Sequence, residues 1–100
     1  STQRLKEKKT ELTGVLGRIY YEQGQFDQAY VALKRAYEEN TEKLAFIPIY
    51  YGLVLVKKKE FKTAKPLLAD AIRLGSIDDK VLLKKLLSMM EVAYKIMLYS

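Results

Sequence analysis

The residue types that most often carry out catalysis are missing from this chain. It contains no cysteine and no histidine, which removes the usual thiolate and imidazole ligands of metals and the usual partners of covalent catalysis. The remaining candidates are carboxylates adjacent in sequence, Glu38 with Glu39 and Asp78 with Asp79. Neighbouring residues on a helix point apart, so neither pair predicts a shared proton or a metal site. We therefore expect no enzyme activity, no cofactor and no metal.

Basic residues are the next group that could bind a ligand. The net charge of +6 arises mainly in residues 44–100, which carry ten Lys and Arg against five Asp and Glu, with a cluster at Lys57–Lys59, Lys62 and Lys65. Such a cluster can bind phosphates or headgroups, but more often it keeps a turn soluble. We favour the solubilising role and keep attachment to an anionic membrane or nucleic acid as an alternative. Nucleic acid is the less favoured ligand, because most tyrosines fall at packing positions.

The elements that must position these residues repeat along the chain. A period of thirty-five residues is typical of helical hairpins that stack on one another. We expect Gly17 and Gly52 to lie halfway along the first helix of each hairpin, opposite Ala29 and Ala64, where small residues let two helices approach closely. The recurring positions pair Leu12 with Ile47, Gly17 with Gly52, Phe26 with Phe61, Ala29 with Ala64, Leu33 with Leu68, and Ala36 with Ala71.

Periodicity and helix-ending residues predict five helices. The first should carry an apolar face and end at Gly24, and residues 1–9 should form a helical extension or a linker. Pro48 is tolerable because it falls in the first turn of the third helix. The fifth is apolar around far more of its circumference than one hairpin requires. The expected ranges are about 10–23, 26–39, 46–58, 62–74 and 79–98, and the apolar face of the first helix consists of Leu12, Leu16, Ile19 and Tyr20.

The repeated segment resembles the tetratricopeptide repeat. A second, degenerate copy runs from Tyr51 to Ala71, with Lys59 where the first copy has a turn glycine. The resemblance covers about residues 10–78 and implies an all-α, right-handed helical-hairpin solenoid. Its expected parts are an extension at 1–9, repeats at 10–43 and 44–78, and a C-terminal capping or assembly helix at 79–100. The motif is carried by Leu16, Gly17, Tyr20, Tyr21, Gly24, Phe26, Ala29, Leu33 and Ala36.

The resemblance implies a non-catalytic module that binds a peptide or helix of another protein. In the family, the first helix of each unit lines a concave groove. Its chaperone-binding members hold a terminal carboxylate with a lysine and an asparagine, but the matching residues here are Gly14 and Arg18, so that clamp is not preserved. Packing between the repeats is the alternative role for each groove position. The positions carried over are Glu11, Gly14, Arg18, Tyr21, Glu22, Phe46, Ile49, Tyr50, Leu53, Val56 and Lys57.

Self-assembly is a second functional hypothesis. Two hairpins fall short of the three or so that a solenoid usually needs, and the fifth helix has apolar residues to spare, so we expect a homo-oligomer as an alternative to a foreign partner. No apolar run approaches the roughly 20 residues that span a bilayer, so we expect a membrane as partner only through segments outside this sequence. The residues leave the localisation unknown, with the cytoplasm favoured. The expected assembly residues are Leu83, Leu87, Met90, Tyr94 and Met97.

Overall fold

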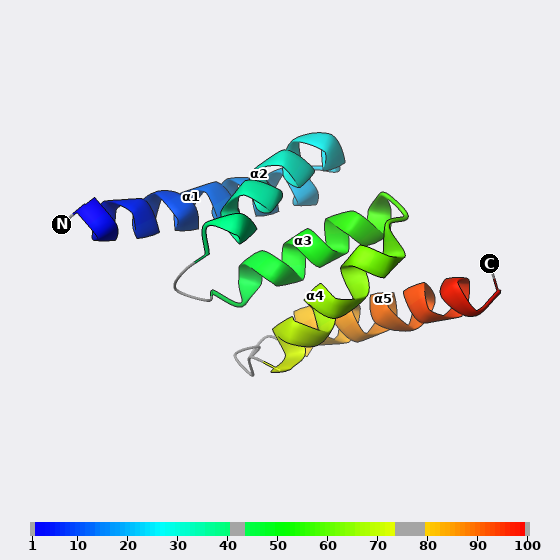
Figure 1. The fold of residues 1–100 in the computed structure, drawn as a ribbon. Helices are drawn as coiled ribbons and strands as arrows, with labels where there is room; N and C mark the ends of the chain where they lie inside the picture. The colour runs from blue at the N-terminus through cyan, green and yellow to red at the C-terminus, as the bar shows by residue number, and fades with distance from the viewer. Residues whose placement is uncertain (1, 41–43, 74–79, 100) are drawn as a thin grey trace.

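The computed structural model describes residues 2–40, 44–73 and 80–99, which form five α-helices and no strand (Figure 1). The all-α prediction is therefore confirmed. Most helix ends lie close to their predicted places, but the first helix begins at Thr2 instead of residue 10, because residues 2–9 are rich in good helix formers. The predicted unit boundaries at 43/44 and 78/79 fall at segments outside the described residues. The helices are α1 (Thr2–Glu22), α2 (Phe26–Glu38), α3 (Phe46–Lys57), α4 (Phe61–Arg73) and α5 (Lys80–Tyr99).

The same close contact holds α1 to α2 and α3 to α4. A Cβ atom added at Gly17 would lie 2.5 Å from Cγ of Leu33, and one added at Gly52 would lie 2.8 Å from Cγ of Leu68. Both leucines are fully buried. The nearest side chains are those of the leucines, one turn further along each second helix than the predicted Ala29 and Ala64. The backbone carbonyl oxygen of Ala64 also lies within contact, 3.8 Å from a Cβ atom added at Gly52. The thirty-five-residue period is nonetheless repeated in the packing.

The turns of the two hairpins also share one hydrogen-bond pattern. The amide of Gln25 donates to the carbonyl of Tyr20 at 2.9 Å, and the amide of Glu60 donates to the carbonyl of Leu55 at 2.8 Å. Each turn needs a residue with left-handed backbone, which is Gly24 at φ 77° in the first and Lys59 at φ 63° in the second. A residue with a Cβ atom is strained in this region. The second hairpin therefore keeps the turn although it lacks the glycine.

Replacing Lys59 by glycine is expected to stabilise the protein. The change removes the strain of a left-handed lysine, and we expect the free energy of unfolding to rise by about 1 kcal/mol. Urea denaturation followed by circular dichroism measures this. The matched control is Gly24→Lys in the equivalent turn, which should lower the stability by a similar amount. Equal stability of Lys59→Gly and the parent would show that the turn is not strained.

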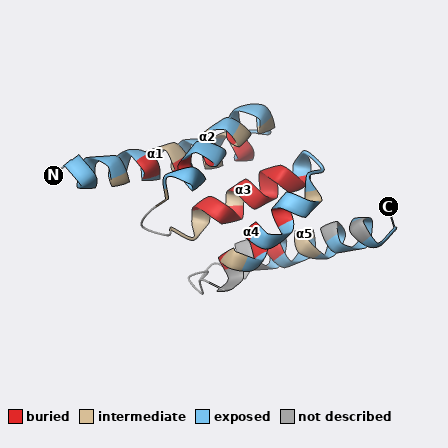
Figure 2. Cartoon of the chain, in the orientation of Figure 1, coloured by how far each residue is buried: buried red, intermediate tan, exposed pale blue. Residues whose placement is uncertain are grey.

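Helix α3 forms the centre of the core, since it contacts each of the other four helices. In Figure 2 it carries the longest stretch of buried residues. A helix that is apolar on all sides is stable only when it is buried on all sides. Its buried residues are Ile47, Pro48, Ile49, Tyr51, Gly52, Leu53, Val54, Leu55 and Val56.

Helix α1 packs with a different face from the one its large apolar residues suggest. Its buried positions are Thr10, Gly14, Gly17 and Tyr21, whereas the predicted apolar face is largely exposed, with only Tyr20 half-buried among its four residues. The two glycines determine this choice, because they allow the shortest distance to the neighbouring helices. The large aliphatic side chains of α1 are consequently left at the surface.

Candidate interaction surfaces

Most of the predicted concave groove is closed by packing. Five of its positions are buried, and α5 contacts α3 beside them, with Met89 and Met90 packed against the core. The Nζ atom of Lys85 lies 5.1 Å from the centre of the Tyr21 ring. In this part of the groove, packing between helices is therefore the better description. The buried positions are Gly14, Tyr21, Ile49, Leu53 and Val56.

The remaining groove positions are scattered. Phe46, Tyr50 and Arg18 are half-buried, and the Tyr50 ring lies 5.7 Å from that of Tyr21. The Arg18 Nε atom is shielded from solvent and has no hydrogen-bond partner among the described residues. Glu11, Glu22 and Lys57 are exposed. These side chains do not form a continuous apolar surface.

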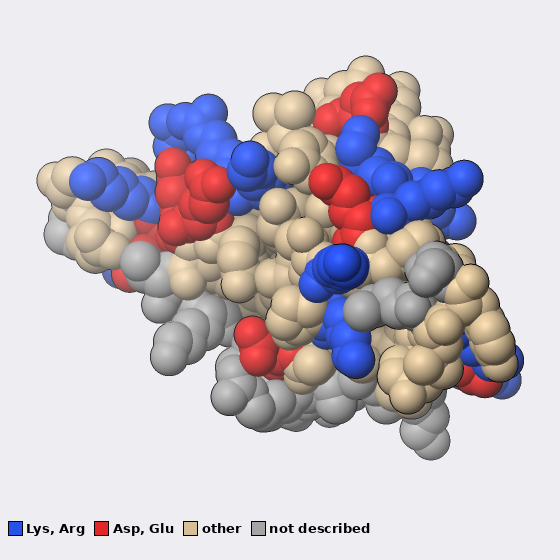
Figure 3. Space-filling model, turned by 45° about the vertical axis from the view of Figure 1, so that its right-hand side comes forward, with Lys and Arg blue, Asp and Glu red and all other residues tan. Residues whose placement is uncertain are grey.

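The lysine cluster is partly engaged within the molecule. Lys58 donates a hydrogen bond of 2.6 Å to the Asp27 carboxylate, and this contact lowers the pKa of Asp27 and raises the pKa of Lys58. The Nζ atoms of Lys58 and Lys65 also lie 5.2 Å from the rings of Tyr30 and Tyr94. Acidic and basic side chains are interspersed on the face seen in Figure 3. These contacts fit a structural and solubilising role for the cluster.

Helix α5 exposes part of the predicted assembly surface. Leu87 and Tyr94 are about half exposed, whereas Met90 is half-buried against the core. The side chains of Leu83 and Met97 lie outside the described part of the structure. Leu98 was not predicted, but at 60% exposure it lies on the same side of the helix as Leu87 and Tyr94, at spacings of seven and four residues. We call Leu87, Tyr94 and Leu98 the α5 stripe.

A second exposed apolar surface, which we call the α1 stripe, follows the outer side of α1. Its members recur at spacings of seven, four and three residues and so lie on one side of the helix. Beside it, α1 and α2 enclose an open depression of about 550 Å³ that Leu16, Val31 and Ala32 help to line. The stripe consists of Leu5, Leu12, Leu16 and Ile19, which are 70%, 68%, 45% and 40% exposed.

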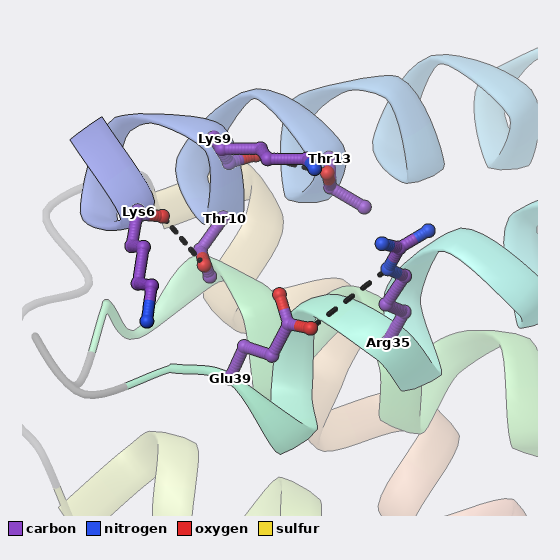
Figure 4. Close-up of polar contacts among 6 residues, drawn as sticks. All are labelled: Lys6, Lys9, Thr10, Thr13, Arg35 and Glu39. Carbon is purple, nitrogen blue, oxygen red and sulfur yellow. Dashed lines mark hydrogen bonds and ion pairs between the residues drawn. The ribbon is translucent and has the colours of Figure 1, made fainter. Parts of the chain in front are cut away.

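Polar side chains lie towards the N-terminal end of the α1 stripe (Figure 4). The Thr13 hydroxyl donates to the carbonyl of Lys9 at 2.9 Å. Across the depression, Arg35 Nε lies 3.8 Å from Glu39 Oε1 in an exposed ion pair. An ion pair of this kind contributes little to stability. These charged groups are therefore free to exchange partners when another chain approaches.

The repeat shows what covers the equivalent surface of the second hairpin. Thirty-five residues after Leu12, Leu16 and Ile19 come Ile47, Tyr51 and Val54, which are all buried. Helix α2 packs on α3 at Tyr51, whose ring lies 6.0 Å and 5.5 Å from the rings of Tyr30 and Tyr37. Ile47 lies against α1 instead, because its Cγ1 atom would be 2.9 Å from a Cβ atom added at Gly14. Burial is the main cause that raises the pKa of Tyr51 to about 12. The three positions are thus buried in the second hairpin and exposed in the first.

The α1 stripe was missed at the sequence level, although its residues were recognised as one apolar face. The repeat contained a signal, because the residues thirty-five positions after Leu12, Leu16 and Ile19 are buried, and a difference in burial between equivalent positions marks an exposed surface. Among the described residues, no three carboxylates lie close enough together to hold a metal ion. None of the described helices has the length and apolar character needed to cross a bilayer. No family model, curated protein or solved structure matches this chain.

Proposed function

We propose that this chain is a non-catalytic protein-interaction module, built as two tetratricopeptide-like hairpins in a short solenoid with a C-terminal helix. One observation carries the proposal: Leu12, Leu16 and Ile19 are exposed, whereas the residues thirty-five positions later are buried, with Tyr51 packed against α2. Burying one large aliphatic side chain is worth roughly 1.5–3 kcal/mol. A stripe of four exposed aliphatic residues on one side of a helix is therefore a surface that another polypeptide would gain free energy by covering.

The occupant of the α1 stripe is a helix of another protein molecule. Helix α2 is the model for it, because α2 lies on the matching face of α3 through an aromatic pair seven residues apart, Tyr30 and Tyr37. An amphipathic helix with large apolar or aromatic residues at this spacing would lie along Leu12, Leu16 and Ile19 in the same way. The closed groove between α1, α3 and α5 is a less suitable site, since a peptide there would have to displace packed residues.

A peptide copied from α2 tests this function. We expect a fluorescein-labelled peptide of residues 26–40, held helical by a staple between positions 31 and 35, to bind the intact chain with a micromolar Kd in a fluorescence anisotropy titration. Leu16→Glu should weaken binding at least tenfold, because it places a charge at the centre of the apolar contact. The staple replaces residues on the side of the peptide away from the two tyrosines.

Val92→Glu is the matched control for that experiment. Val92 on α5 has the same exposed fraction as Leu16, 45%, but lies outside the α1 stripe, so its replacement should leave the peptide affinity unchanged. Equal affinity of the parent and Leu16→Glu would refute the proposed site. Attachment to an anionic surface has less support, since Lys58 and Lys65 of the basic cluster already contact aromatic rings or a carboxylate.

A further inference from the structure

We propose that the partner of the α1 stripe is the α5 stripe of a second copy of this chain, so that copies associate head to tail. This inference rests on the proposed function and names its partner. Both stripes are exposed and apolar, and they lie on the first and the last helix of the stack (Figure 1). When two copies join through different surfaces, the first copy keeps a free α1 stripe and the last copy keeps a free α5 stripe. Further copies can therefore add at both ends.

The two stripes match residue by residue when their helices run parallel. On α1 the order is Leu5, Lys9, Leu12 and Leu16, and on α5 it is Leu87, Glu91, Tyr94 and Leu98. Both series have the spacing of four, three and four residues that forms the seam between paired helices. In this register three apolar pairs enclose one pair of opposite charges, which is formed by Lys9 and Glu91.

The charged pair is available for this contact. Lys9 is exposed, and Glu91 is exposed with Lys95 as its neighbour at 3.3 Å in an i,i+4 ion pair. Exposed pairs of this kind are weak and exchange readily. Antiparallel alignment of the same stripes, with Leu98 opposite Leu5, would place Lys9 opposite Tyr94 and Glu91 opposite Leu12. The charges therefore favour the parallel arrangement over this antiparallel one.

The arrangement of helices within one copy also favours parallel contact. In Figure 1, α1, α3 and α5 all run from left to right, and α3 contacts both α1 and α5. Placing α1 of a second copy beside α5 continues this row of parallel helices without reversing its direction. Within one copy, Ile47, thirty-five residues after Leu12, already lies at such a parallel contact, because its Cγ1 atom would be 2.9 Å from a Cβ atom added at Gly14 of α1.

Complementary variants test the head-to-tail contact. The α1 variant, Leu12→Glu with Leu16→Glu, keeps only the α5 stripe, and the α5 variant, Tyr94→Glu with Leu98→Glu, keeps only the α1 stripe. We expect the parent chain to grow beyond a dimer between about 5 and 500 μM in sedimentation velocity and light scattering. Each variant alone should stay monomeric. An equimolar mixture of the two should form a one-to-one dimer and nothing larger, because only one functional contact remains.

A charge exchange tests the register. Lys9→Glu should weaken association several-fold, and adding Glu91→Lys in the same chain should restore it, whereas an antiparallel contact would not respond in this paired way. Val92→Glu, on α5 outside its stripe, should associate like the parent, and circular dichroism confirms that every variant is folded. The inference is overturned if the parent stays monomeric, if the α5 variant dimerises alone, or if the mixed variants do not combine.

The outcomes also separate this inference from the proposed function. Binding of the α2 peptide at Leu16 by a chain that stays monomeric would leave the interaction module intact and remove only the second copy as partner. If substitutions in the α1 stripe change neither the affinity for the peptide nor the association of copies, the proposed site itself is refuted.

Discussion

Replacing Leu53 by glutamate is expected to unfold most of the protein. Leu53 is 1% exposed on the central helix α3, so the substitution removes packing and forces a carboxyl group into an apolar core. We expect the free energy of unfolding to fall by about 4 kcal/mol or more, which is most of the stability of a domain of this size. Circular dichroism should show loss of helix at 25 °C. A folded Leu53→Glu chain would mean that α3 is not the core helix.

Leu12→Glu is the matched control for this substitution. The residue change is identical, but Leu12 is 68% exposed, so the helix content and the denaturation midpoint should stay close to those of the parent. The two substitutions test whether the burial of these leucines is the opposite of what the sequence predicted. By its family position Leu53 was expected to line a groove, whereas Leu12 lay on the apolar face of its helix.

Gly52→Ala is expected to destabilise the second hairpin, although alanine is the better helix former. The helix propensity favours alanine by up to about 1 kcal/mol. The new Cβ atom would lie 2.8 Å from Cγ of Leu68, which is close to the backbone of α4 and cannot move away alone. Overpacking of this kind costs about 1–3 kcal/mol. The steric effect should therefore exceed the gain in helix propensity. We expect urea denaturation to show a free energy of unfolding lower by roughly 1–2 kcal/mol.

A double-mutant cycle identifies the cause of that loss. With Leu68→Ala as the background, Cγ is gone and Gly52→Ala should become neutral or stabilising, so the sign of its effect reverses. Both backgrounds are compared at one concentration of a stabilising osmolyte, so that the weaker one retains a folded baseline. An unchanged loss in the two backgrounds would rule out the contact between Gly52 and Leu68 as its origin.

Local sequence signals predicted the helices well because each has a local physical cause. Gly24 ends α1 by taking the left-handed backbone, and Pro48 is accommodated in the first turn of α3. The repeat predicted Gly17 and Gly52 as close-contact sites, and the packing confirms this role. The leucines that make the closest contacts were not predicted, since sequence spacing does not show how far along the second helix a leucine side chain reaches.

The surfaces were harder to predict because burial depends on neighbours that a local pattern does not specify. The apolar face of α1 looks like a core face, but its burial requires a helix that this sequence does not place there. The prediction of a groove along α3 overlooked a signal in the sequence. The segment from Phe46 to Val56 has no polar face and so could not line an open groove.

The position of α3 among the other four helices affects how the molecule opens. In a long repeat array, each unit contacts only its neighbours, and the ends can fray independently. Here both hairpins and α5 share α3, so losing either side exposes the same apolar helix. The amide hydrogens of α3 should accordingly exchange with solvent only through global unfolding, and so share one free energy of opening. Those at the exposed end of α5 should exchange through local opening, with a lower free energy.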